Sequence, residues 1–414
     1  MRVVIVGGGI GGLALGAGLR RAGHEVAVFD RDRDVAATGG YHITLDERAQ
    51  SALARLVAPE TMRRLLASGS ALRLRDRDML WDYRGRLLGY GPDLTGSASI
   101  DIDRITLRTL LADAVGADLH LGSTVSEVGI DDNGTPRVVF VEGTSVTADL
   151  VVGADGTHSV VSRHLAAGPT NHPTGLIGFS GRTRRADLDL TEQQRLGTRS
   201  TMGIGPRGAA LYVGYLDPIG NAALDAPALS MSITTGPTYI WGAMFPESAD
   251  IDSLRALRGR ARQTALIDRF RHRNWARHTL EVIARADPAS VAAFRFNAAS
   301  TRATDLAPWP TGRITALGDA VHATPPTAGM GAGAAIQDAA DLAAQLDSHT
   351  DITAAIGHYE TQLRRRGAQV LTAAMRTVRL ILATDTTPGA LATTTLTPLL
   401  AVAARLRPNP SARR

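Results

Sequence analysis

The chain has 414 residues, of which 44% are hydrophobic, and its mean hydropathy of −0.02 is typical of a globular protein. All 45 basic residues are arginines, and the formal net charge of +5 is spread along the chain instead of gathering in basic runs with interleaved aromatics, which argues against nucleic-acid binding. The absence of cysteine excludes disulfides, iron–sulfur clusters and a cysteinyl link to a flavin.

The first 30 residues carry a dinucleotide-binding pattern. Val3–Val6 is apolar throughout, like a strand buried on both faces, and a GxGxxG motif follows, made by Gly7, Gly9 and Gly12. Such glycines permit a tight turn, close approach to a pyrophosphate and close packing of a helix whose free N–H groups face the phosphates. A second strand ends at Asp30, where a carboxylate can accept hydrogen bonds from an adenosine ribose. The stretch therefore predicts a βαβ unit.

A second GxGxxG pattern lies far from the first. It is made by Gly203, Gly205 and Gly208, with Pro206 inside it and an alternating, strand-like stretch after it. This context predicts a hairpin turn and no bound nucleotide.

Hydrophobic patterning divides the remaining chain. Residues 71–98 alternate like two strands around Arg84-Gly85, and residues 172–296 hold several more strands and a helix at 252–272. Long helices are expected from 352 to 383. We predict an α/β fold with a discontinuous Rossmann-like nucleotide-binding domain (1–70, 99–171 and 297–346), an inserted antiparallel-sheet substrate domain (71–98 and 172–296), and C-terminal helices with a tail (347–414).

The expected location is cytoplasmic. The first strand begins at residue 2, which leaves no room for a signal peptide, and no apolar run approaches the ~18 residues of a membrane span. The apolar segment 396–406 fits a membrane surface, but a helix docked on the protein's own core is the favoured interpretation. We expect a monomer or homodimer.

Three motifs, in this order, resemble those of the flavoprotein monooxygenases of the p-hydroxybenzoate hydroxylase type. They are GGGIGG at 7–12, GADGTHS at 153–159 and GRITALGDAVHATPPTAGMGAG at 312–333. The resemblance covers most of the chain and implies bound FAD, with Asp319 on the ribityl chain, Arg104 near the phosphates, and Asp155 near FAD and the nicotinamide. The full set of expected FAD-binding residues is Gly7, Gly9, Gly12, Asp30, Arg31, Arg104, Asp155, Gly318, Asp319, Pro325 and Gly331.

Residue chemistry in the third motif agrees with this implication. Gly318 allows a strand end to approach a ligand, and Pro325 stiffens the loop that would stand beside the flavin ring. Gly331 lies at the start of a helix whose positive N-terminus can stabilise an anionic reduced flavin.

The resemblance also implies the reaction. In that family NAD(P)H binds transiently and reduces FAD, O2 forms a flavin hydroperoxide, and one oxygen atom passes to the substrate. We therefore expect an enzyme, an FAD-dependent monooxygenase that consumes NAD(P)H and acts on a small aromatic or polycyclic molecule, without a metal. Two alternatives stay open: a flavoprotein reductase or dehydrogenase of a lipid-like substrate, and a cyclase or binding protein that holds FAD without redox turnover.

Residues that touch the substrate are harder to assign. The strand TYIWGAMF places Tyr239 and Trp241 on one face and Met244 on the other, and either face can roof a pocket or simply pack the sheet. Arg182 can meet an anionic substrate or remain solvated. His42 lies in GGYHITL, which by the resemblance runs beside the isoalloxazine ring, so it is the expected catalytic side chain, with a structural histidine as the alternative.

Overall fold

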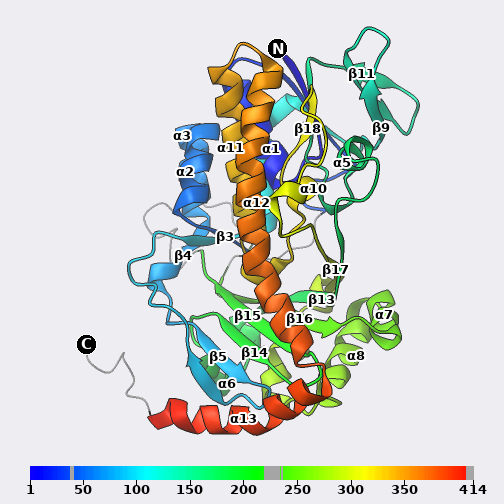
Figure 1. Cartoon of the computed structure of the whole chain (residues 1–414). Helices are drawn as coiled ribbons and strands as arrows, with labels where there is room; N and C mark the ends of the chain where they lie inside the picture. Colours follow the sequence, from blue (N-terminus) through cyan, green and yellow to red (C-terminus); the bar gives the residue numbers. More distant parts are fainter. Residues whose placement is uncertain (38–41, 219–233, 235, 407–414) are drawn as a thin grey trace.

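The structure is a computed structural model that describes residues 1–37, 42–218, 234 and 236–406. Its upper half in Figure 1 is built on a five-stranded parallel sheet with the strand order β18-β12-β1-β2-β8. The strands of this sheet are β1 (Arg2–Val6), β2 (Glu25–Asp30), β8 (Leu119–Leu121), β12 (Leu150–Gly153) and β18 (Ile314–Ala316).

Both faces of this sheet are covered, as its apolar strands require. Val3 and Ile5 of β1 pack in a core with the helices on one face, whereas Val4 and Val6 pack against a small antiparallel sheet on the other. The helices that contribute to the first core include α1 (Ile10–Arg21), α4 (Arg104–Val115), α11 (Gly331–Ser348) and the upper part of α12 (Ile352–Ala383). The opposite layer contains β9 (Val125–Ile130), β10 (Pro136–Phe140), β11 (Ser145–Thr147) and α5 (Val160–Leu165).

A seven-stranded sheet forms the lower half of Figure 1, in the order β17-β13-β16-β15-β14-β5-β6. Its neighbours are antiparallel except for β14 and β5, which run parallel. The strands are β5 (Met79–Asp82), β6 (Leu87–Tyr90), β13 (His172–Arg184), β14 (Thr201–Ile204), β15 (Ala210–Leu216), β16 (Thr238–Pro246) and β17 (Ala292–Ala298). The fold is thus the predicted one: a parallel nucleotide-binding sheet with an inserted, largely antiparallel second sheet.

A third sheet lies where the two halves meet. It has the order β3-β7-β4 and contains β3 (His42–Leu45), β4 (Gly69–Ala71) and β7 (Ile100–Asp103). Helices α2 (Glu47–Leu56) and α3 (Pro59–Ala67) connect β3 to β4. Strands β3 and β7 pair so that His42 lies opposite Asp103. From these strand ends, both side chains contact residues of the second sheet.

The two faces of the seven-stranded sheet differ in what they pack against. One face carries Tyr239, Trp241 and Phe245 into a core with Phe270 and Trp275. That core is closed by α6 (Leu190–Leu196), α7 (Ala249–Ala256), α8 (Gly259–Arg271) and α9 (Glu281–Ala284). The other face packs partly on the lower end of α12, which runs down both halves of the molecule in Figure 1.

Two predictions made from the sequence can be compared with the observed elements. The second glycine pattern is confirmed as a hairpin turn between β14 and β15, closed by a hydrogen bond from Gly205 N–H to Ala209 O of 2.8 Å. The single helix expected at 252–272 is wrong: the chain breaks between α7 and α8, where Gly259 has φ +52°.

The C-terminal helix α13 (Thr387–Leu406) docks on the protein along one side only, where Thr397 and Ala401 are buried. Its other side exposes four leucines and a valine: Leu391, Leu396, Leu399, Leu400 and Val402. No described helix is both long and apolar enough to span a membrane.

Candidate functional site

The turn between β1 and α1 has the geometry that a pyrophosphate requires. Gly7 has φ +111°, and a Cβ there would lie 2.4 Å from Ala154 O, while a Cβ at Gly12 would lie 2.0 Å from Gly7 O. No described side chain caps the N-terminus of α1 at Gly9, so its first N–H groups are available to phosphate oxygens.

Asp30 lies at the end of β2 beside this turn and is 9% exposed. Its Oδ2 accepts a hydrogen bond from Gly8 N–H (2.6 Å), and its Oδ1 accepts one from Asp32 N–H (2.7 Å). Because each carboxylate oxygen has a second lone pair, ribose hydroxyls can still be accepted. Asp30 therefore both shapes the turn and presents an acceptor at the expected end.

An arginine that the sequence analysis missed stabilises the same turn. Arg108 of α4 is 4% exposed, and its Nε donates to Gly8 O (2.9 Å) while its guanidinium lies 3.3 Å from Asp30 Oδ2 and 2.8 Å from Asp32 Oδ2. The signal was present, because Arg108 interrupts the apolar face of its helix. The side chain of Arg31, the predicted residue next to Asp30, is exposed.

The third motif folds into a tightly held loop between β18 and α11. Gly318 has φ +60°, and its N–H donates to Asp338 Oδ2 (3.0 Å), which also lies 2.6 Å from His322 Nε2. Arg366 Nε donates to Asp338 Oδ1 (2.8 Å). Burial alone would raise the pKa of Asp338, but His322 and Arg366 lower it. This carboxylate of α11, which the sequence analysis did not single out, thus fixes the start of the loop.

The remainder of that loop gathers the expected flavin-binding groups. Asp319 accepts a hydrogen bond from Thr324 N–H (3.2 Å); burial raises its pKa, and the nearby charges of His322 and Arg104 oppose that rise. A Cβ at Gly331, the first residue of α11, would lie 3.7 Å from Asp319 Oδ1. No described side chain caps α11, so its N-terminal N–H groups face the space beside Asp319.

Two further motif residues lie around this space. Pro325 precedes the short helical turn Pro326–Ala328, and Gly329, with φ +65°, follows it. Asp155 lies beside Gly7; its Oδ2 accepts from Val160 N–H (2.7 Å), and the Ser159 side chain also hydrogen-bonds its carboxylate. Burial raises the pKa of Asp155. The glycine turn that a Cβ would fill and the two uncapped helix N-termini fit an extended dinucleotide such as FAD.

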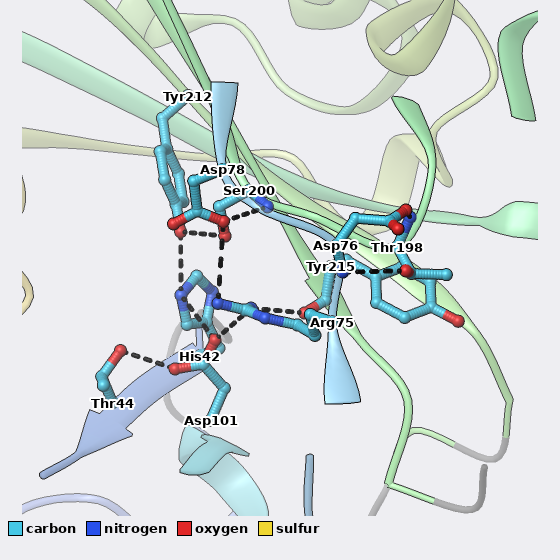
Figure 2. Close-up of polar contacts among 10 residues, drawn as sticks. All are labelled: His42, Thr44, Arg75, Asp76, Asp78, Asp101, Thr198, Ser200, Tyr212 and Tyr215. Carbon is cyan, nitrogen blue, oxygen red and sulfur yellow. Dashed lines mark hydrogen bonds and ion pairs between the residues drawn. The ribbon is translucent and has the colours of Figure 1, made fainter. Parts of the chain in front are cut away.

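A partly buried polar cluster lies between the three-stranded sheet β3-β7-β4 and the second sheet (Figure 2). His42 of β3 is 3.2 Å from the hydroxyl of Tyr212 on β15, and that hydroxyl donates to Ser200 Oγ (3.1 Å). Asp101 of β7 lies 3.7 Å from His42 Nε2 and accepts hydrogen bonds from Arg75 Nη1 (2.7 Å) and Thr44 Oγ1 (2.5 Å). Both parts of the chain therefore contribute polar groups to one site.

The direction of the His42–Tyr212 hydrogen bond depends on which ring nitrogen of His42 carries the proton. If the Tyr212 hydroxyl donates its one proton to Ser200, Tyr212 Oη accepts from His42 Nε2–H. In that tautomer Nδ1 of a neutral imidazole is a proton acceptor. Burial, and then the charge of Asp101, raise the pKa of Tyr212, so its hydroxyl stays protonated near neutral pH.

The face of the second sheet that fronts His42 carries small and apolar residues beside Tyr212. A Cβ at Gly214 would lie 2.6 Å from His42 Cε1, which identifies the face of β15 that fronts the cluster. On the same face, Gly242 of β16 pairs with Tyr212 and Ser180, and a Cβ there would meet no described atom within 4 Å. The apolar side chains of this face include Met202, Ile204, Met244, Phe294 and Phe296.

The residues expected to touch the substrate lie on both faces of the second sheet. Tyr239 and Trp241 are 0% and 1% exposed in the helix-covered core, and Tyr239 Oη donates to Gly197 O, so neither reaches the face that fronts His42. Met244 does lie on that face. Arg182, for which contact with an anionic substrate and with solvent were both open, forms an ion pair of 2.5 Å with buried Asp103, the residue that caps α4.

Comparisons with known proteins agree with this geometry. The FAD-dependent urate hydroxylase of Klebsiella pneumoniae subsp. pneumoniae is 26% identical over 373 residues, covering 87% of this chain and 85% of the relative. The chloroplastic zeaxanthin epoxidase of Spinacia oleracea is 26% identical over 356 residues, 84% of this chain. This chain spans about half the length of several such relatives, 48% in that case.

Solved structures share the fold. The crystal structure of Klebsiella pneumoniae HpxO complexed with FAD and uric acid matches with a TM-score of 0.74 and 23% identity, covering 97% of this chain and 93% of the other. The 2,6-dihydroxypyridine-3-hydroxylase of Arthrobacter nicotinovorans matches with a TM-score of 0.71 and 18% identity, covering 92% of each chain.

The family model described as "FAD binding domain" matches residues 1–194 and 243–374, which is most of the chain. It spans the β1–α1 turn, the Asp155 loop and the Gly318–Gly331 loop described above. The chain therefore belongs to the FAD binding domain family, as the three sequence motifs predicted.

Proposed function

We propose that this protein is an FAD-dependent monooxygenase that consumes NAD(P)H and inserts one oxygen atom from O2 into a small aromatic or polycyclic substrate, in the flavin-hydroperoxide chemistry that the sequence resemblance implies. The observation that supports it most is the partly buried contact between His42 and Tyr212, which joins the flavin half to the second sheet. Relatives that are FAD-dependent hydroxylases and epoxidases support the same reaction class.

FAD would be held by residues that the structure already arranges. The β1–α1 turn and Asp30 suit the adenosine and pyrophosphate, and Asp319 with the N-terminus of α11 suits the ribityl chain and ring. When bound, FAD supplies the electron transfer and the activation of O2, which side chains cannot provide.

His42 and Tyr212 would act on the substrate. Neutral His42 accepts a proton at Nδ1 from a substrate hydroxyl while its Nε2–H remains bonded to Tyr212, and loss of that proton makes a phenolic ring more nucleophilic. The second sheet would help to exclude water, because its face beside His42 carries Gly214, Gly242 and Met244 next to Tyr212.

The substrate is proposed to be neutral and apolar apart from its hydroxyl. The space over Gly242 lies next to Tyr212 and among Met202, Met244 and Phe294, which suit a flat ring system. Arg182 is already paired with Asp103, so it is not offered to a carboxylate.

A test begins with the purified, FAD-loaded protein. We expect NADH or NADPH to reduce the flavin, faster when a hydroxylated polycyclic aromatic is present, and O2 to be consumed with one oxygen atom appearing in the product. The substitution His42→Ala should leave FAD content unchanged and lower oxygenation by about 100-fold or more, the usual contribution of a general base.

The matched control is His172→Ala, because His172 is an exposed histidine at the start of β13. The His172→Ala variant should oxygenate the substrate at the rate of the unmodified protein. Full activity in the His42 variant would refute the catalytic role of His42. A bound flavin that neither nucleotide reduces, with any aromatic tried, would favour a protein that holds FAD without redox turnover.

A further inference from the structure

The Asp101 carboxylate is fully buried and lies close to three polar side chains. It is 1% exposed, and its two oxygens meet Thr44 Oγ1, Arg75 Nη1 and, at a longer distance, His42 Nε2 (Figure 2). An ionised carboxylate buried this deeply must be compensated by a positive charge. Two side chains compete for that role.

The distances assign the role to Arg75. Its Nη1 lies 2.7 Å from Asp101 Oδ2, within hydrogen-bond range, whereas His42 Nε2 lies 3.7 Å from the same oxygen, beyond it. The Arg75 side chain is only 3% exposed, so solvent does not screen the pair. Arg75 is thus the counter-ion of Asp101, and His42 is a neighbour of a charge that is already balanced.

Arg75 is also fixed in place from the second sheet. It follows the short helical turn Leu72–Leu74 and donates a second hydrogen bond to Tyr215 O of β15 (3.1 Å). Its other Nη lies 4.0 Å from Asp78 Oδ1. Among the described residues, the charged and titratable groups that face His42 are therefore Asp101 on β7, Arg75 and Asp78 before β5, and Tyr212 on β15.

We propose that Arg75 is a positioning residue that keeps His42 neutral by balancing the charge of Asp101. This inference rests on the proposed function, in which a neutral His42 accepts the substrate proton. Without Arg75, Asp101 would be an uncompensated negative charge 3.7 Å from an imidazole, and the protonated form of His42 would be favoured. With Arg75 present, the nitrogen that receives the proton stays free.

The first test uses NMR titration of the His42 ring signals in the FAD-loaded protein without substrate, assigned by their loss in His42→Gln. In Arg75→Met we expect the midpoint of this titration to move up by about 1 to 3 pH units, the range that one nearby opposite charge produces. In Asp101→Asn the midpoint should move down, because Arg75 is then unbalanced. In the double variant both charges are gone, and the midpoint should return close to its starting value.

This series stays informative if Arg75→Met alone folds poorly, because Asp101→Asn and the double variant leave no carboxylate buried without a partner. The result that would overturn the inference is a midpoint that does not move in opposite directions in the two single variants. A purely structural Arg75 would lower stability without that pattern.

Turnover provides the second readout. The acidic limb of the kcat/KM profile should move to higher pH in Arg75→Met, to lower pH in Asp101→Asn, and back in the double variant. If the NMR midpoints shift as stated but the protein shows no oxygenation under any condition, the proposed function fails while the role of Arg75 stands. If oxygenation is found and the midpoints do not shift, the role of Arg75 fails alone.

Discussion

Single glycines mark the places where this fold makes room for ligands. Gly7 and Gly12 cannot carry a side chain because backbone atoms lie within 2.4 Å of where Cβ would be. Gly242 differs, since the space over it is open in the described part of the chain. The first two glycines are thus required by the backbone, and the third leaves room for a molecule.

Gly242→Val tests that interpretation. Valine suits a strand, so we expect an unchanged melting temperature and FAD content. Its methyl groups would occupy the space beside Tyr212, so substrate binding, measured as ligand-induced change in the flavin spectrum, should weaken by at least about tenfold, or roughly 1.4 kcal/mol. Gly89→Val on β6, where a Cβ also meets no described atom, is the control and should bind normally. Equal binding by both variants would place the substrate elsewhere.

At the scale of single residues, the sequence predicted those site residues whose geometry depends on short-range spacing. The glycines of the first turn and Asp30 lie within one βαβ unit, so their geometry follows from local pattern. The cluster of Arg75, Asp101 and Tyr212 did not emerge from the sequence, because its members come from three strands or turns far apart in the chain and meet only through tertiary packing.

Among the helices and strands, α11 does most to fix the loop that joins β18 to α11, and it does so through the side chain of Asp338. Asp338 bonds Gly318 N–H, His322 and Arg366, so the helix and the start of the loop form one unit. Burial alone would lower the pKa of His322, but the Asp338 carboxylate raises it above 6.5. The ion pair therefore contributes stability that depends on pH.

The sign of that dependence can be worked out. A histidine whose pKa is higher in the folded state adds its full stabilisation below its unfolded value, here 6.5, and loses it as pH rises through the folded value. We therefore expect the free energy of unfolding of the unmodified protein to exceed that of His322→Gln by more at pH 6 than at pH 9. Urea unfolding at several pH values measures this difference; a difference that stays constant with pH would contradict it.

Strand β16 shows the limit of element-level prediction. Alternation correctly placed Tyr239 and Trp241 on one face and Met244 on the other. Alternation does not say which face meets the flavin half, because that depends on where α8 and the His42 strand pack. The aromatic face turned out to be the helix-covered core, and the face with Gly242 and Met244 fronts His42.

Across the whole molecule, the two halves are tied by polar side chains that cross between them. Besides the His42–Tyr212 contact, Arg182 of β13 reaches Asp103 of β7, which is 0% exposed and also caps α4 through Oδ1. Such a pair adds orientation more than net stability, but breaking it leaves a buried charge.

Arg182→Met should therefore lower the free energy of unfolding by about 3 to 5 kcal/mol, as expected when one member of a buried pair is removed. Arg184→Met, two residues along the same strand, changes an exposed surface pair with Asp187 and serves as the control, with little change expected. Urea unfolding measures both. If Arg182 instead binds an anionic substrate, its variant should keep its stability and raise KM for carboxylated aromatics only.

The path of the chain has a consequence for how the protein is made. Strands β12 and β18 are parallel neighbours, yet β18 follows β12 only after strands β13 to β17 of the second sheet, with β12 ending at Gly153 and β18 beginning at Ile314. At the ~5–20 residues per second of synthesis, the roughly 160 intervening residues take on the order of 10 to 30 s. During that time one edge of the nucleotide-binding sheet has no partner strand on the ribosome, so this is the interval in which the nascent chain most needs protection from aggregation.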